Sequence, residues 1–515
     1  GGSYSISAAA ANFIAANTNG NLLFSVTGNF TQTNGNFTGQ AFSGNVKPDS
    51  IMIGGDFLFN SPTATNYFYA NKGASSIGGT TFKVQGNFHI QNSGTLDGQG
   101  VYGVYQANSV LDFFVGGNFT LTTGRFNGIF NGDGNFTSVI NGSFTQLNGF
   151  YRGVHNLISQ QSGIASFTAN SVTYNRGQFA VFFANSVLPN VATFNVINDV
   201  TINFFSVQDT FTVIGVELVE PSSNEKRLNF TIGGNLTIGG ANGTFVSSKA
   251  KGREVVSITG NVAISGGVNT FNSSLLFTHP NGHPVIMTIG GNLGVTGGST
   301  FLSSRADTIL CTVNGNVSIS GGSLSLKGGA GYSVLNINGG FSQTSGNFYI
   351  HNSTTIANTE VTHATMTVNA DGNNLGDFVH SAGIFTFDNS TSSLSVAPVL
   401  VVKSPNYTIG PGGTMTKASN TLFSTLKFLR TAGTITFTRN NGHTIQEIKQ
   451  LVDLNTTLDV VSGNLQIGSY SNAAAATDFL KVDGNSVLDL HTNSVFSNQQ
   501  YGFSGLLILA ARLRT

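Results

Sequence analysis

The stretch SVTGNFTQTNGNFTG, residues 25–39, contains the motif Gly-Asn-Phe-Thr twice. Similar strings recur along the chain, as in VQGNFHIQNSGTL (84–96), VGGNFTLTTGRF (115–126) and IGGNLTIGGANGTF (232–245). In the central copies the apolar residue after Asn is Leu236, Val262, Leu293, Val317 and Phe341. The steps between these residues are 26, 31, 24 and 24. A loose repeat of this length is typical of solenoid proteins.

Apolar and polar residues alternate on both sides of the Gly in each copy. Phe113 and Val115 share one parity before it; Phe119 and Leu121 share one parity after it, with Thr120 on the other. A period of two predicts β-strands with one buried face. Gly ends each short strand because it can adopt the positive φ of a tight turn.

Short strands joined by Gly corners cannot bury their apolar row alone and must stack. We therefore predict an all-β fold, a right-handed parallel β-helix (β-solenoid) with irregular coils of roughly 20–31 residues. In this fold Phe or Leu fills the core and Thr faces outward. Asn tolerates the left-handed conformation at the corner, and its side chain could bond its own backbone or stack as an amide ladder. Inward Gln32, Gln146 and Gln343 must be hydrogen-bonded if buried.

With 515 residues, the chain exceeds what one compact core supports. We divide it into N-terminal solenoid coils (1–151), irregular β coils or an insertion (152–228), regular solenoid coils (229–415) and altered β coils that can continue the solenoid (416–515). The irregular segment loses the motif and contains a charged run.

Charge is scarce and balanced. Charged residues make up 9% of the chain, with 22 basic and 22 acidic residues, so the formal net charge is zero. Nucleic acid and anionic membranes need a basic footprint, and we expect neither as a partner. No apolar run reaches the roughly 18 residues of a membrane span, so we expect no transmembrane segment.

Residues that often carry chemistry have structural explanations here. Cys311 occupies a slot that Phe113 and Leu335 fill in other copies, so we expect an inert core thiol. His279 and His283 in THPNGHP could share a metal, but no Cys, Asp or Glu stands nearby, and a solvated turn is favoured.

Enzymes that act on polysaccharides from a parallel β-helix place clustered acids or bases on one face. Acidic residues such as Asp97, Asp112 and Asp133 do not recur at one register of the repeat. The charged strings KGRE (251–254) and EPSSNEKR (220–227) are expected on solvated loops. We expect no catalytic residue, no cofactor and no metal.

Outward Thr pairs such as Thr120 with Thr122 raise the question of an ice-binding face, which needs a flat, regular Thr array. Later copies replace the Thr by Ala263 or Gly294. The high β-propensity of Thr is therefore the favoured explanation.

The strings GNFTQTNGNFTG, INGSFTQLNG and INGGFSQTSGNF resemble the Gly-Asn-Phe-Thr-Gln-Thr-Gly-type repeats of large secreted surface proteins of Bacteroidota. The resemblance covers about two thirds of the chain. It implies export by the type IX route and an adhesin-like or fibre role. It also implies candidate O-glycosylation at Ser50 and Thr308, since Asp49-Ser50-Ile51 and Asp307-Thr308-Ile309 match the pattern that this group modifies.

We accordingly expect a non-enzymatic extracellular or cell-surface protein: a rigid stalk, a surface adhesin or a fibre subunit. Expected partners are a second copy bound end to end, carbohydrate surfaces, or secretion or outer-membrane machinery. The alternative is a carbohydrate-binding or polysaccharide-degrading β-helix protein with its groove in residues 152–228.

Overall fold

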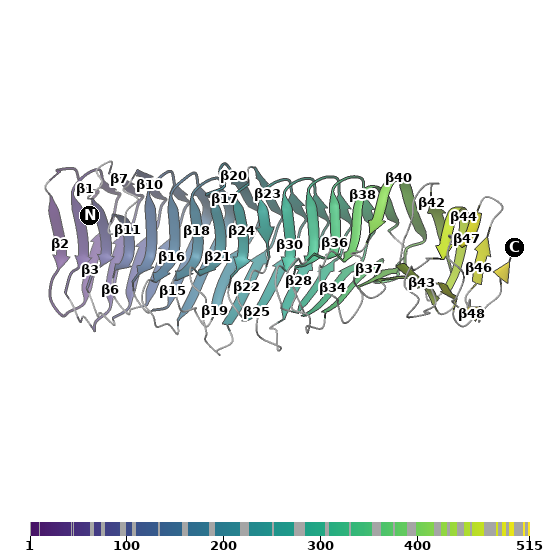
Figure 1. The fold of residues 1–515 in the computed structure, drawn as a ribbon. Coiled ribbons are helices and arrows are strands. Elements are labelled where there is room, and N and C mark those ends of the chain that lie inside the picture. The colour runs from purple at the N-terminus through teal and green to yellow at the C-terminus, as the bar shows by residue number, and fades with distance from the viewer. Residues whose placement is uncertain are drawn as a thin grey trace. The chain divides into compact units, whose positions relative to one another are not determined.

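β-Strands are the only regular elements among the residues described by the computed structural model, and no helix occurs among them (Figure 1). The described residues are 2–416 apart from 10, 43, 45, 62–65, 74–77, 93–98, 106–109, 132–133, 157–162, 185–190, 217–225, 241, 250–251, 272–283, 304–307, 329–330, 353–361, 374–375 and 389–397, together with the strands beyond residue 416. They form two compact units. Unit 1 comprises residues 1–258 and 266–276, and unit 2 comprises residues 259–265 and 277–515.

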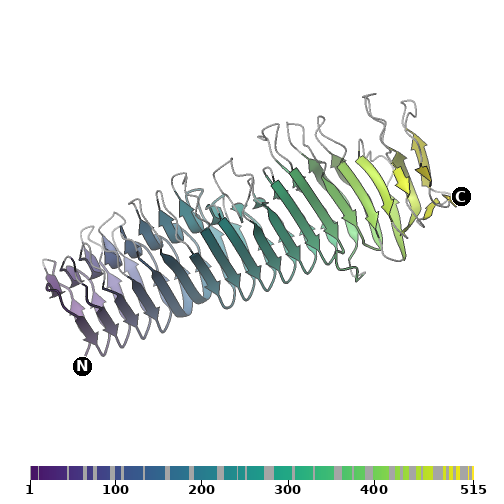
Figure 2. The ribbon, with the colours of Figure 1, turned by 90° about the horizontal axis from the view of Figure 1, so that it is seen from below.

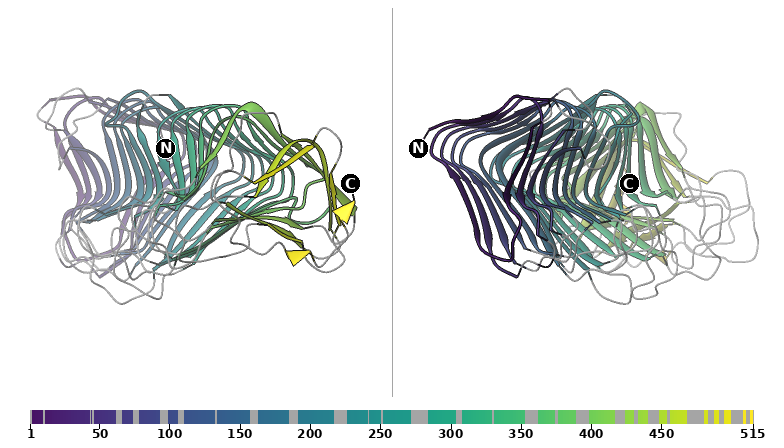
Figure 3. Two further views of the ribbon diagram at one scale, coloured as in Figure 1. Left: turned by 45° about the vertical axis from the view of Figure 1, so that its right-hand side comes forward. Right: turned by 90° about the vertical axis from the view of Figure 1, so that its left-hand side faces the viewer.

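Each coil offers three strand positions, which we call A, B and C in chain order. Position A precedes the corner with the Gly-Asn motif, B follows that corner, and C follows the next one. A strand pairs in parallel with the strand at the same position of the neighbouring coil, so the arrows of each stack point the same way (Figure 2). Within each unit, successive coils therefore overlie one another (Figure 3). The predicted β-solenoid is confirmed.

In unit 1, position A is occupied by β3 (Leu22–Val26), β6 (Asp49–Ile53), β9 (Thr80–Val84), β12 (Leu111–Val115), β15 (Phe136–Gln146), β17 (Ile164–Tyr174), β19 (Val191–Val196), β22 (Lys226–Ile232) and β25 (Gly252–Ile258). Position B is occupied by β1 (Tyr4–Ile6), β4 (Phe30–Gln32), β7 (Phe57–Asn60), β10 (Phe88–Asn92), β13 (Phe119–Leu121), the second halves of β15 and β17, β20 (Val200–Phe204) and β23 (Leu236–Gly240). Position C is occupied by β2 (Asn12–Ala16), β5 (Asn36–Gln40), β8 (Tyr67–Asn71), β11 (Gly100–Tyr105), β14 (Arg125–Phe130), β16 (Phe150–Asn156), β18 (Gln178–Ala184), β21 (Thr210–Val216), β24 (Thr244–Ser248) and β27 (Val268–Thr270).

In unit 2, position A is occupied by β28 (Val285–Ile289), β31 (Ile309–Val313), β34 (Gly331–Ile337), β37 (Thr362–Val368), β39 (Val399–Val402), β41 (Ser424–Leu429), β43 (Ile448–Asp453), β45 (Leu480–Val482) and β48 (Ile508–Leu509). Position B is occupied by β26 (Val262–Ile264), β29 (Leu293–Val295), β32 (Val317–Ile319), β35 (Phe341–Gln343), the first halves of β38 (Phe378–Asp388) and β40 (Asn406–Thr416), β42 (Gly433–Arg439), β44 (Thr456–Ile467), β46 (Val487–Leu490) and β49 (Leu513–Arg514). Position C is occupied by β30 (Ser299–Ser303), β33 (Ser323–Lys327), β36 (Asn347–His351), the second parts of β38, β40 and β44, and β47 (Ser494–Asn498).

Aromatic rings stack along the core of unit 1, because each core slot lies directly over the same slot of the next coil. Phe57 stacks on Phe30 with ring centroids 5.3 Å apart and on Phe88 with centroids 4.5 Å apart. Phe119 continues the column at 4.9 Å from Phe88 and 5.1 Å from Phe144. All five rings are fully buried. The Phe of the Gly-Asn-Phe-Thr motif therefore fills the core, as predicted.

The Asn of the motif forms a ladder from coil to coil, which we call the amide ladder, but its bonds join a side-chain oxygen to a backbone N–H and not two side-chain amides as predicted. Through Oδ1, Asn29, Asp56 and Asn87 each accept the backbone N–H of the corresponding residue one coil on, at 2.8, 2.7 and 2.9 Å. In unit 2, Asn261 and Asn292 do the same at 2.8 and 2.7 Å. The other predicted role, a left-handed Asn, is wrong for these residues, because none of them has a positive φ.

Glycine has a different role at each of the two corners. Beside the amide ladder, Gly117 lacks the predicted positive φ, so that prediction is wrong there. A Cβ on Gly117 would lie 2.6 Å from Oδ1 of Asn87, so close packing of the coils is what requires Gly. At the corner before position C the prediction is confirmed: Gly346 has φ +72°. Gly298, Gly322 and Gly383 hold the same place in neighbouring coils and also have positive φ.

The three inward Gln residues are fully buried and hydrogen-bonded, as predicted. Each donates from Nε2 to the carbonyl of the corner glycine three residues on: Gln32 to Gly35 at 2.7 Å, Gln146 to Gly149 at 2.9 Å and Gln343 to Gly346 at 3.0 Å. Each also donates to a carbonyl of the next coil. These residues fasten the corner, which explains polar side chains in an apolar core.

Strands β16 to β22 lie in the segment that loses the motif, yet they keep the coil register. β17 pairs with β15 across both positions A and B, and β19 and β20 continue the two stacks. The predicted segment boundaries at residues 151, 228 and 415 stay predictions.

Candidate binding faces

A largely buried aromatic cluster lies on the side of position C that faces away from the phenylalanine column. Core residues such as Phe68 and Val101 alternate with Tyr69 and Tyr102, which therefore point to the opposite side. The ring centroids of Tyr69 and Tyr102 are 5.1 Å apart. The ring centroid of Tyr105 lies 4.9 Å from that of Tyr69. Four tyrosines and Phe130 make up this cluster: Tyr67, Tyr69, Tyr102, Tyr105 and Phe130.

Cations extend the cluster at both ends. Nζ of Lys72 lies 5.1 Å from the ring centroid of Tyr67 and 5.2 Å from that of Tyr69. On the neighbouring strands, Arg125 lies 5.2 Å from the ring of Phe150 and Arg152 lies 5.4 Å from it. These distances are within the range of cation–π attraction.

Arg152 is held from several sides. Its guanidinium carbon lies 4.7 Å from the Phe183 ring, and Nη2 donates to Oε1 of Gln178 at 2.7 Å. Nη1 lies 3.0 Å from Nε2 of His155. The His155 ring in turn contacts Phe130 at a centroid distance of 5.0 Å, so the cations adjoin the aromatic cluster directly.

Burial and mutual repulsion shape the ionisation of these cations. Burial, and then the neighbouring Arg152, lower the pKa of Arg125 to about 10. Burial, then Arg152 and Arg125, lower the pKa of His155 to about 3. His155 is therefore neutral at physiological pH and offers its ring nitrogens as hydrogen-bonding groups, while both arginines keep their charge.

We call the residues around Phe150, Arg152, Gln178 and Phe183, with the aromatic cluster, the aromatic–cationic face. The accessible members of this face are Lys72, which is exposed, and the half-buried Tyr67, Tyr105, Phe150, Gln178 and Phe183. Its other members are buried: Tyr69, Tyr102, Phe130, Arg125, Arg152 and His155. Aromatic ring faces and hydroxyls are groups that bind sugars, and a positive charge favours sugars that carry a carboxylate. The C-position residues carry no motif, so sequence reasoning missed this face.

A second face is made of threonines at position B. Thr120, Thr145, Thr173, Thr201 and Thr237 are the outward residues of five successive coils, each in register with the next. We call this row the threonine ladder. The sequence alone shows only isolated Thr pairs, because corners of different length hide the register of the coils. Val172 and Val200, which pair, are 28 residues apart in sequence, whereas Val200 and Leu236 are 36 apart.

The two candidate O-glycosylation sites lie at position A. Ser50 is half-buried in β6, between Leu23 and Thr81 of the neighbouring coils. Asp49, next to it, is buried and accepts hydrogen bonds from the Leu22 N–H at 3.2 Å and from Nδ2 of Asn71 at 3.0 Å. Thr308 is half-buried just before β31, and Asp307 lies outside the described residues. Modification of either site stays a prediction.

The predicted core position of Cys311 is confirmed, and its lack of reactivity stays a prediction. Cys311 is 1% exposed in β31, and burial raises its pKa to about 12. His279 and His283 lie outside the described residues. Among the described residues, no group of three or more His, Cys, Asp or Glu side chains is placed to hold a metal.

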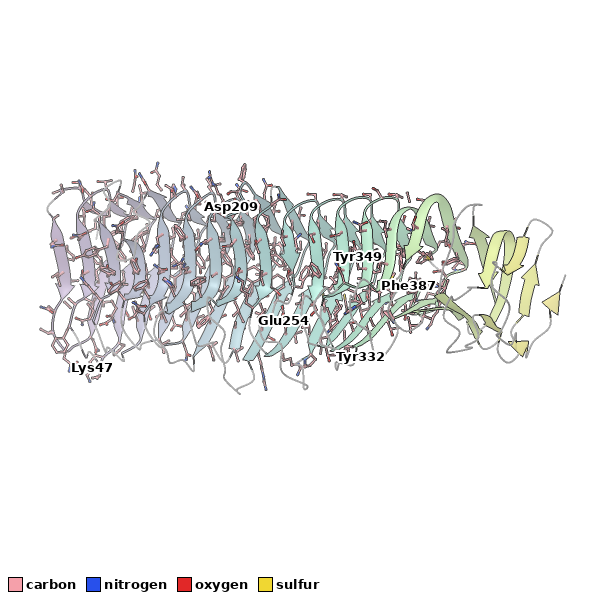
Figure 4. All side chains as sticks on the ribbon, in the orientation of Figure 1. Lys47, Asp209, Glu254, Tyr332, Tyr349 and Phe387 are labelled. Atoms are coloured by element: carbon pink, nitrogen blue, oxygen red, sulfur yellow. The ribbon has the colours of Figure 1, made fainter. Side chains whose placement is uncertain are left out.

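The prediction that KGRE (251–254) forms a solvated loop is wrong for its last residues. Arg253 and Glu254 belong to β25, and Figure 4 labels Glu254. Arg253 is exposed, whereas Glu254 is buried and accepts a hydrogen bond from the hydroxyl of Ser247. Strand alternation turns every second side chain inward, and charge alone does not reveal which one. In EPSSNEKR (220–227), only Lys226 and Arg227 are described, and both lie in β22.

No family model, curated protein or solved structure matches the chain. The resemblance to Bacteroidota surface repeats therefore stays a prediction from the motif. No helix among the described residues is long and apolar enough to cross a membrane.

Proposed function

We propose that this chain is a non-enzymatic extracellular structural protein that serves as a stalk, adhesin or fibre subunit. The stacking of coils in register supports this role. In each unit a core column, an amide ladder and parallel backbone hydrogen bonds all run along the same direction, so a pulling force along the stack is shared among many bonds. The neutral, Asn- and Thr-rich surface suits contact with carbohydrate or with another copy.

The aromatic–cationic face supports a second candidate function, carbohydrate binding. Half-buried Phe150 and Phe183 flank the Arg152 guanidinium, and Gln178 lies within hydrogen-bonding distance of it. Such a site would bind a sugar ring on the half-buried rings of Phe150 and Phe183, and the positive charge of Arg152, which is 9% exposed and bonded to Gln178, would favour a sugar that carries a carboxylate. This function adds adhesion to the structural role.

Electron microscopy of native material with antibody labelling tests the structural role. Labelled rods or filaments on the cell surface are expected, and label confined to the cell interior would contradict the proposal.

Incubation with a panel of neutral and acidic polysaccharides tests the second function and separates it from catalysis. Retention of the protein on acidic polysaccharides without new reducing ends or unsaturated products is expected. Release of such products would instead indicate the polysaccharide-degrading alternative.

A further inference from the structure

An array of small uncharged side chains in register lies on the outer side of position A in unit 1. It consists of two outward residues from each of four successive strands, β15, β17, β19 and β22: Thr137 and Val139, Ser166 and Thr168, Thr193 and Asn195, Asn229 and Thr231. We call these eight residues the hydroxyl array.

The two columns of the hydroxyl array are in register throughout. In one, Thr137 pairs with Ser166, which pairs with Thr193, and that residue with Asn229. In the other, Val139, Thr168, Asn195 and Thr231 are matched by the same ladders. Between the columns run the buried core residues Phe167, Phe194 and Phe230, which fix the direction of every outward side chain. The array is therefore rigid as well as regular.

The polar groups of the array are not used by the protein. None of its hydroxyl or amide groups makes a side-chain hydrogen bond within the described structure, and all eight residues are half-buried or exposed. The array itself has no charged residue; Asp112 lies beside Thr137 in the preceding coil, and Arg227 lies two residues before Asn229. Donors and acceptors left free at fixed spacing point to a ligand that repeats at the same spacing.

Water in a tetrahedral lattice has a suitable spacing. Hydrogen-bonded oxygens lie about 2.75 Å apart, and tetrahedral geometry then places second neighbours about 4.5 Å apart. Parallel strands are spaced at about 4.8 Å, so the mismatch is about 0.3 Å per coil and about 1 Å across the array. β-Branching restricts the χ1 rotation of Thr and Val in a strand, which lowers the cost of ordering these side chains against water.

We propose that the hydroxyl array binds the surface of ice. Its hydroxyl and amide groups anchor ordered water, and the methyl groups of Thr and Val fill the gaps between the anchored molecules. This activity goes beyond the proposed structural role. It concerns residues of position A and leaves the explanation of the outward threonines of position B by β-propensity as a prediction.

Two assays with the full chain test the proposal: inhibition of ice recrystallisation, and the fraction of protein taken up into a slowly growing ice crystal. We expect activity in the unaltered protein, with at least a tenfold higher concentration needed after Thr168→Lys, which places a charged side chain in the middle of the array. Thr193→Lys is the second array variant, and circular dichroism shows that each variant keeps its strands.

Thr312→Lys is the matched control. Thr312 is a half-buried outward residue of β31 in unit 2, in the place along its strand that Thr168 has in β17, and the apolar Leu310 holds the place of Ser166. This variant should retain full activity. The proposal fails if the unaltered protein is no more active than serum albumin, or if Thr312→Lys is as damaging as Thr168→Lys. It also fails if the array variants lose binding to crystalline cellulose or chitin while no form of the protein affects ice.

Discussion

Replacing Gly346 by Ala probes the corner on which the stacking of coils depends. The φ of +72° is in the left-handed region, which costs an L-residue roughly 1–2 kcal/mol. The new Cβ would also lie 2.6 Å from the carbonyl oxygen of Gly322 in the neighbouring coil. That oxygen accepts the Asn347 N–H at 2.9 Å, so relieving the clash breaks a ladder bond between coils.

Leaving a buried donor or acceptor unsatisfied costs about 1–3 kcal/mol. With the conformational cost, Gly346→Ala should lower the free energy of unfolding of unit 2 by about 2 to 5 kcal/mol.

Gly294→Ala is the control in the same unit. Gly294 is an outward residue without positive φ, its nearest neighbour to a new Cβ is Oγ of Ser318 at 3.5 Å, and Ala263 already occupies the corresponding place one coil away. This change should be neutral or stabilise the unit by about 0.4–1 kcal/mol, because Ala restricts the unfolded chain.

Denaturant unfolding followed by circular dichroism gives the difference in stability, and hydrogen exchange with mass spectrometry locates it. Peptides covering residues 317–351 should exchange faster in Gly346→Ala, while peptides covering residues 111–156 in unit 1 should not change. Equal stability and equal exchange in the two variants would refute the explanation of the corner.

Three further predictions concern single side chains. The unfolded chain protonates His155 near its usual pKa of 6.5, but the folded protein does so only near pH 3, so this residue should lower stability by about 2–3 kcal/mol as the pH falls from 6.5 to 4.5. His155→Phe keeps a ring between Phe130 and Phe183. In urea titrations at the two pH values, the stability of this variant should fall less with pH than that of the unaltered protein. An identical loss of stability in both proteins would contradict the burial of a neutral imidazole. Asn118 accepts the Ser143 N–H through Oδ1 at 2.9 Å, so Asn118→Ala should lower the free energy of unfolding in denaturant by about 0.5–1.5 kcal/mol. Asn118→Asp keeps an acceptor, as Asp56 does in its coil, and should lower it less. Equal losses of stability in the two variants would count against the ladder. Cys311 should resist iodoacetamide at pH 8 in the native protein and react fully in guanidinium, as measured by intact mass. Full labelling of the native protein would show that the thiol is not in the core.

The repeat motif predicts the parts of the fold that depend on one residue and its near neighbours in sequence. Phe30 in the core, the amide ladder through Asn29 and the bonded Gln32 follow from strand alternation and corner chemistry. The sequence explains the corner glycines by a single cause, a positive φ, and this cause applies at Gly346 but not at Gly117. There the cause is the side chain of Asn87 in another coil, and such a contact is invisible before the coils are aligned.

The candidate binding faces could not be predicted in the same way, because they arise from register between coils. Arg125, Phe150 and Gln178 lie side by side on three strands but have no common motif. Some strands of the hydroxyl array are not followed by the Gly-Asn motif, and the connections between these strands differ in length. A list of residues that alternate outward in each copy would have identified Thr168 and Thr193 as outward, but not as neighbours.

Disulfide trapping measures the register of the coils directly. Thr120 and Thr145 face outward on neighbouring coils and pair in register, although 25 residues separate them in sequence. The double variant Thr120→Cys/Thr145→Cys, in a Cys311→Ala background, should form an intramolecular disulfide rapidly and nearly completely under mild oxidation, because neighbouring parallel strands are about 4.8 Å apart. Thr120→Cys/Thr173→Cys, two coils apart, should stay reduced. Crosslinking of the second pair, or equal and slow crosslinking of both, would contradict the stacking of one coil directly on the next.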